Sequence, residues 1–134
     1  MRGQAAFEYM ILFSIALLIL GILVFYSQRV TEANRDQIIV ANAMAALNKI
    51  VEASNIVYTQ GEPSQITLSV YIPEKVSSIE FDDNLIIMKI YNEAGTSDII
   101  ATSKAPLQGY VSPSSGMKKI KIAAEVNYVN ITEG

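Results

Sequence analysis

A long apolar run near the N-terminus constrains this chain more than any other feature. Residues 9–28 contain no Asp, Glu, Lys or Arg. As an α-helix rising ~1.5 Å per residue, such a run matches the ~30 Å thickness of a bilayer core. Because a soluble helix does not need such a segment, we expect residues 9–28 to span a membrane. Tyr9 and Tyr26 suit the two interfaces, where amphipathic rings are enriched.

The apolar run differs from an ordinary secretory signal. It is longer than the ~7–15-residue apolar region of such signals. The residues that follow, Tyr26-Ser27-Gln28-Arg29, contain no small-x-small cleavage motif. We therefore expect the segment to be kept in the mature protein, and Arg2 favours a cytoplasmic N-terminus.

The helical pattern continues beyond the apolar run. Apolar or small residues recur three and four positions apart, and no helix breaker occurs between the run and Gly61. This stripe consists of Val30, Ala33, Val40, Met44, Leu47, Val51, Ser54 and Tyr58. We predict one helix from about Ala5 to Tyr58, within a segment 4–60, and expect its half 30–58 to pack on the rest of the protein.

After Pro63 the periodicity changes to two, which is typical of strands. The pattern predicts about five mainly antiparallel strands. We place them at 66–72, 76–81, 85–91, 98–103 and 117–131, with a turn at Asp82-Asp83-Asn84 and a loop over 104–116. A β-domain of this size buries only about 60% of its unfolded surface, so the helix should complete its core. The predicted fold is α+β, one long N-terminal helix packed on a small, mainly antiparallel sheet or sandwich, the head (residues 61–134).

Composition argues against several classes of function. A net charge of −3 with ten scattered Lys and Arg does not suit nucleic acid. The absence of His and Cys removes the commonest general base and every thiolate. What remains is a set of turn acids and a Ser-rich loop, 112–115, near Lys118 and Lys119. We therefore expect no enzyme, no cofactor and no metal site. The Asp82-Asp83-Asn84 cluster favours a plain turn, because it lacks the spaced ligands of a calcium loop.

The N-terminal residues resemble a known class of signal. Arg2-Gly3-Gln4 precede the apolar run, and Glu8 follows four residues after Gln4. With the apolar run and a small β-rich head, this sequence resembles archaeal type IV pilin-like proteins carrying a class III signal peptide of the Gln-x-x-x-Glu kind. Archaellins look similar at this border but usually read Gln-x-Gly, so the pilin interpretation is preferred.

The resemblance implies a processing and assembly route. Residues 1–3 would be a leader, which a prepilin peptidase removes between Gly3 and Gln4 on the cytoplasmic side. The precursor would lie in the cell membrane until an assembly ATPase and its membrane platform add it to a homopolymeric helical filament on the cell surface, with adhesion as its role. The expected filament core comprises Ile11, Leu12, Phe13, Ile15, Leu18, Ile19, Ile22, Leu23 and Phe25.

Glu8 is the residue to which we assign a specific part in assembly. It lies four positions after Gln4, hence on the same helical face. Cleavage would create an α-amino group on Gln4, and Glu8 of one subunit would pair with that amine on a neighbour, an attraction that strengthens in low dielectric. Phe7 and Tyr9 flank it and complete the expected assembly residues. The simpler explanation is that Glu8 lies in the first turn and only complements the helix macrodipole.

Three questions stay open at the level of sequence. Gly21 either lets neighbouring helices approach or is a tolerated glycine of a spanning helix. The sequence Asn130-Ile131-Thr132 is an N-glycosylation sequon that an exported head would carry. For the whole chain, the competing hypotheses are an uncut membrane tether, whose head is a monomeric binding module, and a minor pilin or archaellin.

Overall fold

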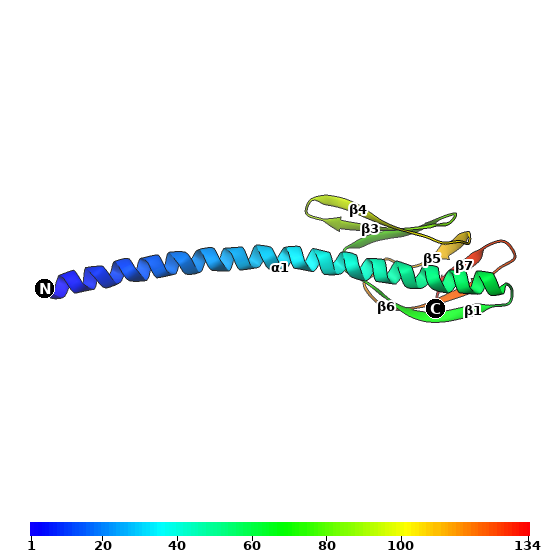
Figure 1. Ribbon diagram of the computed structural model, residues 1–134, viewed down its shortest axis with the longest axis horizontal. Coiled ribbons are helices and arrows are strands. Elements are labelled where there is room, and N and C mark those ends of the chain that lie inside the picture. Colours follow the sequence, from blue (N-terminus) through cyan, green and yellow to red (C-terminus); the bar gives the residue numbers. More distant parts are fainter. The chain divides into compact units, whose positions relative to one another are not determined.

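A computed structural model describes residues 1–134, in two compact units, residues 1–36 and residues 37–134. It contains one long N-terminal helix and seven short strands, so the predicted α+β fold class is confirmed (Figure 1). The elements are α1 (Arg2–Gln60), β1 (Gln65–Ile72), β2 (Val76–Asp82), β3 (Leu85–Asn92), β4 (Gly95–Thr102), β5 (Leu107–Tyr110), β6 (Gly116–Ala124) and β7 (Val129–Glu133).

Helix α1 includes part of the predicted leader. It begins at Arg2, three residues before the expected start at Ala5, because nothing in the first residues prevents helical hydrogen bonding. It ends at Gln60, and the N–H of Gly61 donates to the carbonyl of Val57 at 2.9 Å. Gly61 has φ 74°, a left-handed conformation that glycine adopts without steric cost. The predicted stop signal is thus confirmed.

The strands form two sheets, of four and three strands, where the sequence predicted about five strands in a sheet or sandwich. The four-stranded sheet has the order β1-β6-β7-β5, and the three-stranded sheet has the order β2-β3-β4. All pairs are antiparallel except β5 and β7, which are parallel. The second sheet is a simple meander, whose β2–β3 turn lies at Asp83-Asn84 as predicted.

Two predictions about the C-terminal strands are wrong. The stretch 104–116, expected to be a loop, contains β5. The strand expected over 117–131 is a hairpin of β6 and β7, because a turn closed by Glu125 N–H and the Tyr128 carbonyl at 2.8 Å interrupts it. In one unbroken strand over 117–131, Val126 would lie on the same face as Ile120 and Ile122, but it is 77% exposed at this turn.

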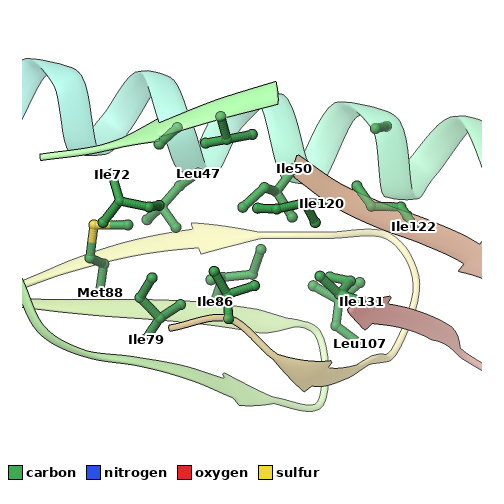
Figure 2. Close-up of a cluster of buried hydrophobic side chains, with 14 of the residues drawn as sticks. Leu47, Ile50, Ile72, Ile79, Ile86, Met88, Leu107, Ile120, Ile122 and Ile131 are labelled. Carbon is green, nitrogen blue, oxygen red and sulfur yellow. The ribbon is translucent and has the colours of Figure 1, made fainter. Parts of the chain in front are cut away.

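One hydrophobic core joins the second half of α1 to both sheets (Figure 2). From the helix come Leu47 and Ile50, and the strands supply the remaining labelled side chains, Ile72, Ile79, Ile86, Met88, Leu107, Ile120, Ile122 and Ile131. No buried side-chain nitrogen or oxygen lacks a hydrogen-bond partner. The expectation that the helix completes the core of the β-domain is confirmed.

The buried face of α1 differs from the predicted one. The buried residues are Ile39, Ala43, Ala46, Leu47, Ile50, Ala53, Ser54 and Val57. Of the predicted stripe after Ala33, only Leu47 and Ser54 are buried, whereas Met44 is 52% exposed. The helix is turned so that Ala43, Ala46 and Ala53 face the core, and such small side chains allow a helix to approach a sheet closely. Burial therefore begins at Ile39 and not at Val30.

Candidate assembly surface on the N-terminal helix

The surface of α1 over residues 9–28 is apolar and uncovered. Every residue from 1 to 35 is exposed, and the expected core residues 11–25 range from 45% exposed at Ile11 to 66% at Phe13. This is the one helix of the chain long and apolar enough to cross a membrane. An apolar surface of this extent marks a membrane or protein contact. It is compatible with membrane anchoring or with a signal sequence.

Two hydroxyl groups in this part of the helix bond to the preceding turn. The Ser14 hydroxyl donates to the Met10 carbonyl at 2.8 Å, and the Thr31 hydroxyl donates to the Ser27 carbonyl at 2.9 Å. Such bonds to the preceding turn let hydroxyl groups enter an apolar medium without losing a partner. At the end of the run, the Arg29 guanidinium lies 4.8 Å from the centre of the Phe25 ring, a cation–π contact.

The predicted assembly residues lie together at the start of the helix. Gly3, Gln4, Phe7, Glu8 and Tyr9 are all exposed, and Phe7 and Tyr9 are 65% and 73% exposed. Gln4 and Glu8 are one helical turn apart on the same face. Glu8 forms no ion pair within the chain. Its carboxylate is therefore available to a partner.

The macrodipole explanation for Glu8 depends on where the helix begins. Because α1 begins at Arg2, its first turn contains no acidic residue. The dipole effect falls off within that turn, so Glu8 lies too far along the helix of the intact chain to benefit from it. Once residues 1–3 are removed, Glu8 would lie at the end of the first turn, so the dipole effect and pairing with a neighbour both stay predictions for the processed chain.

A shallow hollow lies next to these residues. It is lined by Ala6, Tyr9, Met10, Leu12 and Phe13. Helices pack by inserting side-chain ridges into such grooves. The hollow is thus a suitable receptor for a large side chain of a neighbouring helix. Gly21 faces open space, because a Cβ there would meet no atom within 4 Å.

Two polar clusters in the second unit could not be read from the sequence. In the first, the Asn55 Oδ1 accepts hydrogen bonds from the Ser103 hydroxyl at 3.0 Å and from the Lys104 N–H at 2.9 Å. This amide fixes the segment between β4 and β5 to α1. The only feature of the sequence that indicates this contact is a polar residue, Asn55, next to the buried face of the helix.

The second cluster ties the C-terminal strand to the Ser-rich loop. The Lys118 ammonium lies 3.0 Å from the Glu133 carboxylate and 2.8 Å from the Ser114 hydroxyl. The other carboxylate oxygen accepts the Ser112 N–H at 2.9 Å. The Ser112 N–H, and secondly Lys118, lower the pKa of Glu133. The Ser–Lys pair considered from the sequence therefore does come together, and the same lysine also contacts a carboxylate.

The remaining sequence candidates lie elsewhere in the second unit. Asn130 is partly exposed in β7, paired with Gln108 on one side and Ala123 on the other. The carbonyl of Asp83 accepts the Leu107 N–H at 2.7 Å, so the turn backbone anchors the start of β5. No group of three or more His, Cys, Asp or Glu is placed to hold a metal ion.

Comparisons with protein-family models, with curated proteins and with solved structures found no match to this chain.

Proposed function

We propose that this chain is a structural subunit of an archaeal type IV pilus-like surface filament, assembled through residues 9–28 of α1. One observation carries this proposal: an apolar helical surface with no cover in the chain belongs to the same helix that completes the core of a folded domain. A signal sequence that is cut off would not form part of such a core. The apolar surface must therefore be covered by lipid, by other copies, or by each in turn.

The energetics favour a polymer that forms from the membrane. Moving an apolar helix from lipid into a bundle of like helices exchanges one apolar surround for another, so packing and polar pairing decide the balance. Release into water would expose the side chains of the expected filament core, at about 1.5–3 kcal/mol each. A filament assembled this way does not lose subunits to solution, and its assembly is driven by an ATPase in the membrane platform.

Processing would prepare the contact that sets subunit register. Removal of residues 1–3 by a prepilin peptidase gives Gln4 a free α-amino group, and Glu8 of the adjacent subunit accepts it. The exposed position of both residues and the lack of an internal partner for Glu8 support this step. The assembled filament would serve adhesion at the cell surface, with the head facing the surroundings.

N-terminal sequencing of the chain isolated from the cell surface tests the proposal against an uncut membrane tether. We expect a chain that starts at Gln4 and sediments with filaments. A chain that starts at Met1 and stays monomeric in detergent would instead identify the tether. Loss of surface attachment in cells that lack filaments would support the adhesive role.

A further inference from the structure

Strand β1 has a free edge that lacks the usual protection against pairing. It lies at the end of the four-stranded sheet and pairs only with β6. The carbonyl of Ser64 accepts the Ala124 N–H at 2.9 Å, which sets the even-numbered residues as those bonded to β6. In an antiparallel pair, the backbone groups of alternate residues point the other way. Those of Gln65, Thr67, Ser69 and Tyr71 therefore face the open edge.

The other edge strands carry features that discourage pairing. Natural sheets protect their edges with charges, bulges, prolines or short strands. Strand β2 has a bulge between Val76 and Ser78 and carries Glu80 and Asp82. Strand β4 carries Asp98, and β5 is only four residues long. By contrast, β1 reads QITLSVYI over eight residues, with no charge, no proline and no bulge.

An apolar groove runs beside this edge. It is lined by Ala53 and Ile56 of α1 and by Ile66, Leu68 and Ser69 of β1. Ile66 and Leu68 are only partly buried, whereas Val70 and Ile72 on the same face of β1 are fully buried. A strand added at the edge would extend the sheet and cover these two side chains.

Charge along the groove points to a second copy as the occupant. Lys49 and Glu52 also line the groove, and neither takes part in an ion pair. Opposite charges side by side are self-complementary across a two-fold axis, where residue i of one copy meets residue j of the other. An axis near Leu68 would bring Lys49 of one copy toward Glu52 of the second copy.

We propose that the β1 edges of two copies pair antiparallel across this axis and join the two sheets into one. Same-face side chains must lie opposite each other, so Ser69 of one copy faces Thr67 or Ser69 of the second copy. A two-fold contact relates copies that point in opposite directions, whereas a polar filament relates copies that point the same way. The contact would thus link separate filaments side by side.

Single cysteines test this pairing, because the chain has no Cys of its own. The full-length chain in detergent would carry Ser69→Cys, or Thr96→Cys on the exposed edge strand β4 as the matched control. Directly opposite and diagonal neighbours in a sheet lie within ~8 Å, so a short thiol-to-thiol cross-linker reaches in either register. We expect a cross-linked dimer with Ser69→Cys and none with Thr96→Cys. Equal yields from the two variants would overturn the pairing, as would cross-linking of Ser69→Cys only to a different polypeptide.

A charge placed on the edge should abolish the dimer. Thr67 lies opposite Lys121 within the fold, so Thr67→Glu gains a cross-strand partner in one chain. Between copies it places a charge on the pairing edge of each strand, which discourages strand addition. Added to Ser69→Cys, it should remove the dimer without lowering the unfolding temperature, whereas Thr96→Glu should leave the dimer intact. Survival of the dimer with Thr67→Glu would contradict the proposal. The test uses unassembled chains, so its outcome is independent of whether cells form filaments.

Discussion

At the scale of single residues, Glu8 carries the most specific expectation. Replacing it by Gln removes the charge and keeps the shape, so the helix and the distant core should be unaffected. We expect Glu8→Gln to keep the unfolding temperature of the full-length chain and to lower the yield of filaments sheared from cells. Glu32→Gln, which changes another exposed carboxylate of α1, is the control. Normal filament yield from Glu8→Gln would rule out the pairing role.

Glu133 should make stability depend on pH. Its pKa is lowered in the folded chain, first by the Ser112 N–H and then by Lys118. The stabilisation is therefore complete above the unfolded pKa of about 4.3 and is lost as pH falls through the lower folded value. We expect Glu133→Gln to lower the unfolding temperature at neutral pH and to match the unchanged chain at about pH 2. A constant difference across that range, measured by thermal unfolding in detergent, would contradict this assignment. Glu93→Gln, in an exposed turn, is the control.

Gly109 allows β5 to lie against β7. Its φ is 142°, and a Cβ at this position would overlap the carbonyl oxygen of Ile131. Gly109→Ala should therefore destabilise the chain by more than ~1 kcal/mol in denaturant unfolding, the scale of an incompatible Gly→Ala change. Gly116 also has a positive φ, 128°, but no atom within 4 Å of the added carbon. If Gly116→Ala lowers the free energy of unfolding as much as Gly109→Ala does, the positive φ explains the need for glycine at position 109, and the close approach of Ile131 does not.

At the scale of elements, the helix and strands with a regular apolar periodicity were predicted from the sequence. The residues of strands β1 to β3 alternate regularly between the two faces of their sheets, and Gly61 marks the helix end. Strand β5 was missed because it is short, contains Gly109 and pairs with a distant strand. The β6–β7 turn was missed because Val126 and Tyr128 continue the apolar alternation through it. A short strand and an unbroken alternation leave no local sign of a strand or of a turn, so neither feature could be predicted from the sequence alone.

The orientation of α1 on the core is the other element that the sequence misplaced. Two overlapping apolar stripes run along the helix, and periodicity does not say which one faces the sheets. We expect Ile50→Ala, which empties a fully buried site, to cost about 2–5 kcal/mol in denaturant unfolding. Met44→Ala, on the stripe predicted from the sequence, should change stability by only about 0.5 kcal/mol. A larger loss of stability from Met44→Ala than from Ile50→Ala would show that the face of α1 predicted from the sequence is the one that packs on the core.

The candidate site was more predictable than the fold around it. The apolar segment and the residues from Gly3 to Tyr9 form a continuous, local pattern, so length and composition suffice to find them. The Asn55 and Lys118–Glu133 contacts join residues far apart in the chain. Their partners are set by the packing of the sheets, which no local pattern encodes.

At the scale of the whole molecule, one helix serves two environments. Residues 39–57 of α1 are part of a satisfied core, whereas residues 1–35 have no cover within the chain. The burial within residues 39–57 follows from the small size of the β-domain, which needs a helix to complete its core. The proposed cover for residues 1–35 is lipid before assembly and further copies of the chain afterwards.

The most direct test is electron microscopy of filaments sheared from the cell surface, with mass spectrometry of their content. We predict filaments in which this polypeptide is a repeating subunit, with residues 9–28 of many copies bundled along the axis. Filaments that lack this polypeptide, or a chain that stays monomeric with its apolar segment still in the membrane, would contradict the proposed function.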